Sequence, residues 1–202
     1  RMRIVFASGN EGKVREIREM LAGMGIELLS LKDYPAVPDI VEDGETFLEN
    51  ALKKAKIISA ITGETVLADD SGLQVDALGG APGIYSARFA GENATDDDNV
   101  KLLLSRLRDV PPEKRTASFC CVLVLFRTDG HYVSFESRWP GLIIDDRRGH
   151  NGFGYDPVFY IPELNKTAAE LPPEIKNKVS HRGQSFAKLK ESLETAKNKV
   201  GA

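Results

Sequence analysis

The chain has 202 residues, of which 42% are hydrophobic and 28% are charged, a composition typical of a globular protein large enough to bury a core. Its formal net charge of −3 argues against a broad basic surface, so we expect no long nucleic acid as a partner. No apolar run approaches the roughly 20 residues that a membrane span needs, so we expect no membrane partner either. This composition is compatible with a small charged ligand.

The only cysteines of the sequence, Cys120 and Cys121, are adjacent. Neighbouring side chains of a strand point to opposite faces, so these two are poorly placed to form a disulfide with each other. This pattern fits a reducing compartment, and the first residues lack the basic-then-apolar pattern of a signal peptide. We therefore expect a cytoplasmic protein.

The first part of the chain predicts a strand, a loop and two helices. Residues 2–7 are typical of a short buried strand, and apolar residues recur at helical spacing from Lys13 until Gly25. A second helix is predicted at about residues 45–61, with Gly63 as its stop. The chain therefore opens as strand, glycine-containing loop and helix.

The rest of the chain mixes strands and helices. Short apolar runs predict strands at 65–68, 117–126, 131–139 and 158–161. Asp129 and Gly130 predict a hairpin between the second and third of these, which should pair antiparallel. A helix should follow the capping-box pattern at 95–98, whose acidic residues we interpret as helix capping, and the last helix spans about 185–200. This order favours an α/β fold with a mixed β-sheet flanked by helices, in a single bilobed domain over residues 1–202.

The loop after the first strand has the composition of a phosphate site. It reads Ser-Gly-Asn-Glu-Gly-Lys over residues 8–13. Free backbone N–H groups and the positive end of a helix dipole meet an anion where a strand leads into a helix, and Lys13 adds a full charge. The spacing is not that of a Walker A loop, because Gly9 and Gly12 are too close together and Val14 replaces the metal-binding hydroxyl. A plain strand-to-helix turn is the alternative.

A pair of carboxylates, Asp69 and Asp70, comes just after the strand predicted at 65–68. In α/β proteins, ligand chemistry is commonly found at this position. Adjacent side chains of an extended backbone diverge, so we expect one of the two to face a site, with Glu42 or Asp43 as a partner. Hard oxygen ligands together with phosphate suit Mg²⁺, whereas the scattered histidines and cysteines do not suggest zinc. The alternative is a turn closed by an Asx hydrogen bond.

Two further segments have the residues of a base-binding site. Residues 153–157 read Phe-Gly-Tyr-Asp-Pro, and residues 180–183 contain His181 and Arg182. Together they offer an aromatic stacking face and hydrogen-bonding groups for the edge of a purine. A buried aromatic turn and a solvated loop before the last helix are the alternatives. Their occurrence together with the phosphate-like loop and the carboxylates favours a nucleotide site.

Motifs along the whole chain carry a resemblance to a known family: they lie at 8–13, 68–73, 78–91, 152–159 and 180–184. In this order they resemble the Ham1/RdgB family of inosine triphosphate pyrophosphatases. The resemblance implies an enzyme that hydrolyses dITP, ITP and XTP to the monophosphate and pyrophosphate. It also implies Mg²⁺ as cofactor, with Mn²⁺ as a substitute, and a homodimer whose subunits have a central cleft between two α/β lobes.

The resemblance further implies roles for individual residues. Asp70 would be the general base acting on the attacking water, and Glu42 with Asp70 would bind the metal. Lys54 is similar to a phosphate-facing lysine of the family, although Lys53 beside it makes this match ambiguous. The triphosphate would be bound by Ser8, Gly9, Asn10, Glu11, Gly12 and Lys13. Sugar and base would be enclosed by Ser71, Phe153, Gly154, Tyr155, Asp156, Lys176, His181 and Arg182.

The base-binding residues predict a preference among purines. Hypoxanthine and xanthine offer a carbonyl oxygen where adenine offers an amino donor, so donors from His181 or Arg182 would favour the former. Adenine would leave a buried donor unsatisfied, at a cost of about 1–3 kcal/mol. The sequence leaves the preference between ITP and XTP open. It also contains Ser137 where relatives often carry glycine, which predicts a differently shaped end of the hairpin.

Other classes of protein stay open at this point. A nucleotide sensor without catalysis would need the phosphate loop and the base pocket but not the carboxylates at 69–70. A pyrophosphatase for modified pyrimidine or methylated nucleotides would differ in its base pocket. A protein-binding module is disfavoured, because many candidate ligand groups lie in glycine-rich loops.

Overall fold

The computed structural model describes residues 2–200 of the chain, with side chains up to residue 199. Residues 1, 201 and 202 of the predicted domain lie outside the described residues. The chain divides into two compact units. The first contains Arg1–Asp70, Cys121–Glu136 and Ser185–Ala202, and the second contains Ser71–Cys120 and Ser137–Gln184.

The described residues form a seven-stranded sheet in the order β2-β1-β3-β4-β5-β6-β7. Its strands are β1 (Met2–Phe6), β2 (Ile26–Ser30), β3 (Thr65–Val75), β4 (Thr116–Phe126), β5 (Tyr132–Ile143), β6 (Phe159–Ile161) and β7 (Lys166–Thr167). Strand β1 pairs in parallel with β2 and β3, whereas β6 pairs antiparallel with β5 and β7. The predicted mixed sheet is confirmed.

The α-helices of the described part are α1 (Glu11–Met20), α2 (Phe47–Thr62), α3 (Asp96–Arg106), α4 (Pro173–Val179) and α5 (His181–Val200). Short 3₁₀ turns connect several of the elements. With strands alternating with helices along the chain, the predicted α/β class is confirmed. No helix within residues 2–200 has the length and the apolar composition that crossing a membrane requires.

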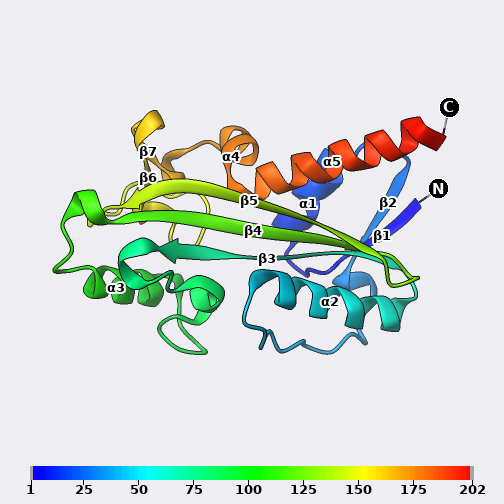
Figure 1. The fold of residues 1–202 in the computed structure, drawn as a ribbon, viewed down its shortest axis with the longest axis horizontal. Helices are drawn as coiled ribbons and strands as arrows, with labels where there is room; N and C mark the ends of the chain where they lie inside the picture. Colours follow the sequence, from blue (N-terminus) through cyan, green and yellow to red (C-terminus); the bar gives the residue numbers. More distant parts are fainter. Residues whose placement is uncertain (1, 201–202) are drawn as a thin grey trace. The chain divides into compact units, whose positions relative to one another are not determined.

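In the first unit, helices cover both faces of the sheet. Helices α1 and α5 lie on one face and α2 lies on the other (Figure 1). Apolar side chains of α1 and α5, such as Ile17 and Phe186, form one buried cluster with Phe6 of β1 and Leu67 of β3. Burial of this apolar surface holds the end of β1, and therefore the loop that follows it, in place.

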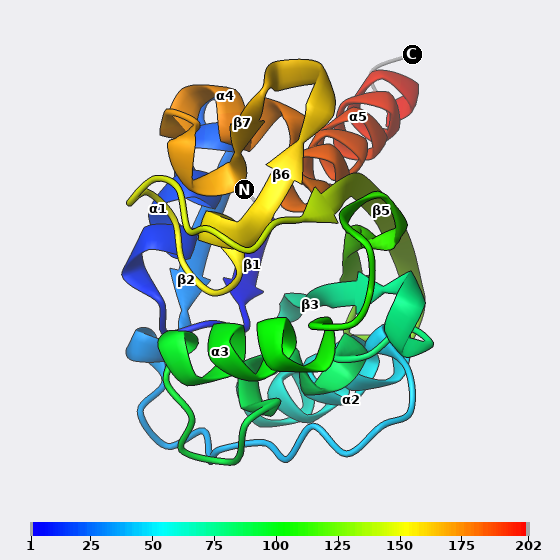
Figure 2. The ribbon, with the colours of Figure 1, turned by 90° about the vertical axis from the view of Figure 1, so that its left-hand side faces the viewer.

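In the second unit, the core is rich in aromatic side chains. Figure 2 shows α3 on one side of the strand segments of this unit and α4 on the other. The rings of Phe119 and Phe159 stack with centroids 4.4 Å apart, and Trp139 lies 5.3 Å from Phe159. Leu103 and Leu107 at the end of α3 belong to the same buried cluster. Such a core gives the loops of this unit a rigid base.

The stop signal of the second predicted helix has the expected geometry, since Gly63 ends α2 with φ of +70°. Thr46, which was not predicted as a cap, caps the start of α2 by accepting from the Glu49 N–H at 3.0 Å. Thr95 forms the predicted capping box at the start of α3. In the predicted hairpin, Gly130 has φ of +93°, a left-handed conformation that glycine adopts without strain.

Several predicted boundaries are wrong. Helix α1 begins at Glu11 and ends at Met20, whereas the sequence predicted a helix from Lys13 to Gly25. Helix α5 begins at His181, four residues before the predicted start at 185, because Ser180 caps it by accepting from the Gly183 N–H at 3.1 Å. Strand β2 and helix α4 were not predicted.

The largest correction concerns the paired carboxylates. The sequence predicted that Asp69 and Asp70 follow a strand ending at residue 68, but β3 continues through them to Val75. They are placed in a strand because β3 lies inside the sheet, between β1 and β4, where tertiary pairing outweighs the low strand propensity of aspartate and glycine.

Strand β5 also runs further than predicted, to Ile143 rather than to residue 139. It passes through Pro140, whose side chain is exposed. Ser137 lies in this strand and is 4% exposed. Its Oγ makes no hydrogen bond with any described residue.

Candidate functional site

The turn between β1 and α1 presents backbone donors at the start of a helix. Asn10 is the N-cap of α1, and its Oδ1 accepts from the Lys13 N–H at 3.1 Å. The Asn10 N–H donates in turn to Ser8 Oγ at 3.0 Å, which fixes the turn. The N–H groups of Glu11 and Gly12 lie in the first helical turn, where a helix offers no backbone acceptor. Such a helix start is suited to bind an anion.

Side chains of this turn point to different partners. Lys13 Nζ lies 3.8 Å from Asp69 Oδ2, and Asp69 is only 4% exposed. The exposed Glu11 instead pairs with Lys32 at the surface. Of the predicted triphosphate-binding residues, Lys13 is therefore tied to the carboxylates, whereas the Glu11 side chain is engaged away from them.

Lys54 of α2 is the cation at the centre of the carboxylates. Its Nζ donates to the Asp69 backbone oxygen at 2.6 Å and pairs with Glu42 Oε1 at 2.8 Å. Burial by itself would lower the pKa of Lys54, but the charges of Asp69 and Glu42 outweigh it and raise that pKa. The Lys54 ammonium therefore stays charged and holds these acidic groups together.

The neighbouring Lys53 has a different position. Its Nζ pairs with Asp43 at 2.6 Å and donates to the Val41 oxygen at 2.7 Å, both in the exposed loop before α2. Consecutive residues of a helix point about 100° apart, so only one of the two lysines reaches β3. The structure thus places Lys54, and not Lys53, beside the carboxylates.

Asp70 has an unusual environment for a carboxylate. Burial, followed by the charge of Glu42, raises the pKa of Asp70 to about 7. Its Oδ2 is buried and makes no hydrogen bond of ordinary geometry with the described residues. Asn50 lies close enough to lower this pKa, although Asn50 Nδ2 also lacks a hydrogen bond of ordinary geometry. Asp70 is therefore poised to exchange a proton near neutral pH.

Asn50 was not predicted as a site residue. It is buried in α2, and its Oδ1 accepts from the Gly44 N–H at 2.7 Å, which ties down the loop that contains Glu42. The signal in the sequence was a polar residue between Phe47 and Ala51 on the inward face of a predicted helix. A buried polar residue at such a position needs hydrogen-bonding partners. Asn50 has such a partner in the loop at Gly44, and it lies close to the carboxylate of Asp70.

The oxygen ligands of this centre fit a hard divalent cation. Within residues 2–200 the structure has no group of three or more His, Cys, Asp or Glu arranged to hold a metal by themselves. The charge of Glu42 is close enough to raise the pKa of Asp70, and the buried Asp70 Oδ2 has spare acceptor capacity. Mg²⁺ is commonly held by one or two carboxylates together with substrate phosphates and water, which matches this pair.

The raised pKa of Asp70 predicts a pH-dependent cost in stability. The pKa is about 7 in the folded protein and 3.8 as its ordinary value, so the folded state binds more protons between these pH values. The contribution of Asp70 to the free energy of unfolding is favourable below pH 3.8 and is lost as the pH rises through 7. We expect Asp70→Asn to raise the free energy of unfolding, with a gain about 2 kcal/mol larger at pH 8 than at pH 5.

This gain is measured by urea unfolding of both proteins with EDTA present, so that no metal compensates the charge. Asp43→Asn is the matched control, because the Asp43 side chain is exposed and its hydrogen bond and ion pair with Lys53 lower its pKa. Asp43→Asn should give no gain at pH 8. A gain for Asp70→Asn that is the same at both pH values would contradict the raised pKa.

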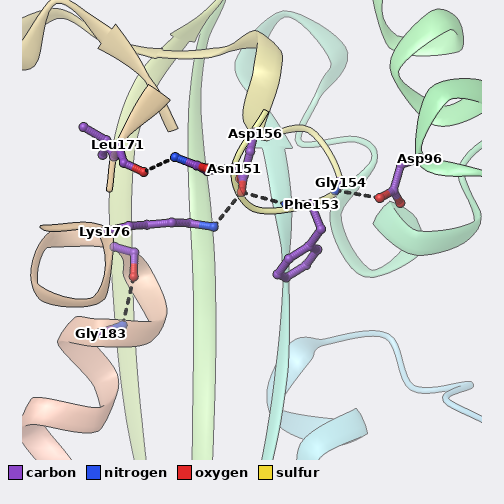
Figure 3. A network of polar contacts seen from close by, with 9 residues as sticks. Asp96, Asn151, Phe153, Gly154, Asp156, Leu171, Lys176 and Gly183 are labelled. Carbon is purple, nitrogen blue, oxygen red and sulfur yellow. Dashed lines mark hydrogen bonds and ion pairs between the residues drawn. The ribbon is translucent and has the colours of Figure 1, made fainter. Parts of the chain in front are cut away.

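In the second unit, the loop at 151–156 carries four of the predicted base-binding residues, Phe153, Gly154, Tyr155 and Asp156. Phe153 is 55% exposed, although aromatic side chains are usually buried. Its N–H donates to Asp156 Oδ2 at 3.1 Å, so the backbone of the loop is fixed while the ring projects out of it (Figure 3). An exposed ring on a fixed loop is suited to stack against a planar base.

Two cations lie near the Phe153 ring. Lys176 Nζ of α4 is 5.2 Å from the ring centroid and Arg182 Cζ of α5 is 5.6 Å from it. Lys176 also pairs with the buried Asp156 at 2.5 Å. A charged pair buried in this way keeps the loop and α4 together. These residues, predicted from separate segments, therefore come together within the second unit.

The remaining predicted residues of this site, His181, Tyr155 and Ser71, are buried or half-buried. The His181 ring stacks on Phe119 with centroids 4.8 Å apart and an interplanar angle of 14°. Tyr155 is buried in the core, and its hydroxyl donates to the Ser86 oxygen at 2.7 Å. Ser71 lies half-buried in β3, directly after Asp70. His181 thus has a fixed ring plane, and Tyr155 anchors the loop rather than presenting its ring to solvent.

The structure therefore divides the predicted residues into two groups. The phosphate group lies in the first unit and consists of residues 8–13, Glu42, Lys54 and Asp70. The base group lies in the second unit and consists of Ser71, residues 153–156, Lys176, His181 and Arg182. One group has the helix start, cation and carboxylates that suit a polyphosphate and a metal. The other has the exposed ring and cations that suit a base.

The fold is that of an α/β protein with a buried carboxylate of raised pKa, Asp70, beside Glu42 and Lys54. The sequence profile of the Ham1 family matches residues 4–192. The chain belongs to the Ham1 family, which confirms the resemblance of its motifs.

Individual relatives agree with this assignment. The chain is 53% identical over 191 residues to a dITP/XTP pyrophosphatase of Geobacter sulfurreducens, with 95% of this chain and 96% of that protein covered. It is 48% identical over 194 residues to a dITP/XTP pyrophosphatase of Vibrio cholerae, with coverage of 95% and 96%. The structure of a HAM1 protein from Coxiella burnetii superposes with a TM-score of 0.92 at 43% identity, covering 96% of this chain and all of that one.

Proposed function

We propose that this chain is a pyrophosphatase that hydrolyses non-standard purine nucleoside triphosphates, dITP, ITP and XTP, to the monophosphate and pyrophosphate. Such an activity removes these nucleotides from the cellular pool. The observation that carries the proposal is Asp70, a buried carboxylate with a pKa of about 7 beside Glu42 and Lys54. Relatives about half identical over nearly the whole chain are dITP/XTP pyrophosphatases, as the sequence resemblance implied.

We propose further that the phosphate group and the base group bind one nucleotide. Residues 1–202 would then form a single bilobed domain, as the sequence predicted. The support is complementary chemistry, since neither group contains what the other supplies. The phosphate group has no aromatic side chain, and the base group has no pair of carboxylates like Glu42 and Asp70.

The chemistry assigned to the phosphate group is a substitution at the α phosphorus together with the transfer of one proton. Asp70 accepts a proton from the attacking water while the water oxygen bonds to the α phosphorus, and the bond from this phosphorus to the bridging oxygen breaks to release pyrophosphate. The backbone N–H groups of Glu11 and Gly12, with Lys13 and Lys54, hold the phosphate oxygens as pyrophosphate leaves. Mg²⁺ bound by Glu42 and Asp70 would neutralise phosphate charge and favour ionisation of the water. Mn²⁺ has similar ligand preferences and would substitute for it.

The chemistry assigned to the base group is recognition. Phe153 stacks on the purine, and Arg182 or His181 donates to the oxygen at position 6 of hypoxanthine or xanthine. The stacking of His181 on Phe119 supports this role, because it fixes the plane in which the imidazole can donate. ATP offers a donor at the same position and is therefore disfavoured.

Two further properties are proposed from the sequence. We propose that the chain forms a homodimer, as the resemblance implies, which sedimentation equilibrium at micromolar concentration would show as twice the mass of the chain. We also propose a cytoplasmic location, which the pair of buried cysteine thiols supports. Detection of the protein in a periplasmic fraction would contradict this location.

A substrate assay tests the proposed function directly. The protein is incubated with ITP, XTP, ATP or GTP and Mg²⁺, and pyrophosphate and orthophosphate are measured separately, with EDTA as the control. We expect pyrophosphate from ITP and XTP, about ten- to a hundredfold less from ATP, and none with EDTA. ITP binding without any hydrolysis would favour a sensor. Hydrolysis of modified pyrimidine or methylated nucleotides instead would place the chain in a different pyrophosphatase class.

A further inference from the structure

The three acidic residues at 96–98, at the start of α3, have different partners, and helix capping accounts for only one of them. Asp98 completes the capping box with Thr95, as the sequence predicted. Asp97 pairs with Lys101 at 2.9 Å and with Arg147 at 2.7 Å. Asp96 does neither: its Oδ2 accepts from the N–H of Gly154 at 2.9 Å, across 58 positions of the sequence.

Gly154 is the residue directly after the exposed Phe153. Gly154 has φ of +62°, a left-handed conformation that glycine adopts readily. Because glycine also adopts many other conformations, the residue itself does not fix the backbone of the loop. Figure 3 shows the Gly154 N–H directed at Asp96, on the opposite side of the loop from the contact of Asp156 with Lys176. The loop is therefore held from both sides, with the Phe153 ring between the two attachments.

Other contacts fix the two ends of this loop. Asn151 Nδ2 donates to the Leu171 oxygen at 3.1 Å, and the Asn151 N–H donates to the Ala169 oxygen at 3.0 Å. Tyr155 is buried, and its burial and the nearby charge of Asp96 raise its pKa. The ends of the loop are thus anchored in the core, and the backbone at the tip is held by Asp156 at the Phe153 N–H and by Asp96 at the Gly154 N–H.

We propose that Asp96 is a positioning residue for base recognition, which holds the Gly154 backbone so that the Phe153 ring is fixed for stacking on the purine. The role rests on the proposed function of Phe153. Asp96 itself touches neither base nor phosphate in this proposal. A ring held in advance loses less conformational freedom when the base binds, so the contact should act on affinity and not on the chemical step.

The test compares substitutions at two adjacent positions. We expect Asp96→Ala to raise KM for ITP about three- to tenfold, because a charge-assisted but solvent-exposed hydrogen bond is lost, and to leave kcat within about twofold. Asp97→Ala is the matched control, since it removes a carboxylate from the same helical turn without touching the loop. Asp96→Asn retains an acceptor oxygen and should restore most of the affinity.

Combination with Phe153→Ala separates positioning from a general structural effect. If Asp96 acts through the Phe153 ring, Asp96→Ala should change KM little once the ring has been removed. Equal KM values for Asp96→Ala and Asp97→Ala would overturn the proposal. Full additivity of Asp96→Ala with Phe153→Ala would overturn it as well.

A measurement without nucleotide keeps the result independent of the proposed function. Amide hydrogen exchange over residues 152–156 should be faster in Asp96→Ala than in wild type or in Asp97→Ala. Unchanged exchange would show that the contact does not hold the loop. Failure of the wild-type protein to hydrolyse any purine triphosphate would refute the proposed function, and the positioning role in base recognition would then be lost even if exchange responds to Asp96.

Discussion

Asp70→Asn should lower kcat for ITP by about 10²–10⁴-fold while changing the affinity for IMP only a few-fold. The substitution removes the proton acceptor and keeps the shape of the side chain. A general base works best when its pKa lies near the working pH, and burial raises the pKa of Asp70 to about 7. The IMP affinity should persist, because the base group lies in the second unit and Asp70 lies in the first.

The measurement pairs steady-state kinetics at saturating Mg²⁺ with calorimetric titration of IMP. Mg²⁺ is varied over a wide range, so that weaker metal binding is separated from loss of the base. Recovery of turnover at high Mg²⁺ would assign Asp70 to metal binding alone. Turnover near that of wild type at ordinary Mg²⁺ would remove Asp70 from catalysis altogether. The unfolding data on the same variant at pH 8 show whether it is folded.

The elements that the sequence predicted well are those with local signals. The N-cap at Thr46 and the left-handed Gly63 bound α2 within two residues of the prediction, and Gly130 produced the expected hairpin. Each of these depends on a backbone conformation or a hydrogen bond within a few residues. The sequence contains that information directly.

The elements that the sequence predicted poorly depend on distant partners. Asp69 and Asp70 read as a turn after a strand, and only the pairing of β3 inside the sheet keeps them extended. His181 and Arg182 read as a loop, but they are buried in the first turn of α5. The His181 ring stacks on Phe119 and the Arg182 guanidinium lies over Phe153, and both of these rings come from other segments.

The site shows the same division between local and distant information. Residue types and order were enough to select the loop at 8–13, the carboxylates at 69–70 and the segments at 153–157 and 180–183 as candidates. The sequence could not distinguish Lys53 from Lys54, because that choice depends on which side of α2 faces β3. It also could not show that Asp96 reaches Gly154, since a helix cap explained every acidic residue of that turn.

Lys54→Met should be the most damaging substitution among the lysines of the site, and Lys53→Met should be nearly silent. Lys54 neutralises a half-buried set of acids, so its loss leaves charges uncompensated and should cost about 2–3 kcal/mol of unfolding free energy without metal. The charge of Lys54 also lowers the pKa of Asp70. Without it that pKa rises further, and less of the base is ionised at pH 7.

For these reasons we expect kcat/KM for ITP to fall about a hundredfold or more in Lys54→Met, with part of the loss recovered at pH 9, where Asp70 ionises again. Lys53 pairs with Asp43 at the surface, so Lys53→Met should change unfolding by less than about 1 kcal/mol and activity by less than about threefold. Urea unfolding with EDTA and kinetics at both pH values test this pair. Equal effects of the two substitutions would show that contact with the carboxylates does not determine the loss of activity and stability. Lys54 would then no longer belong to the phosphate group.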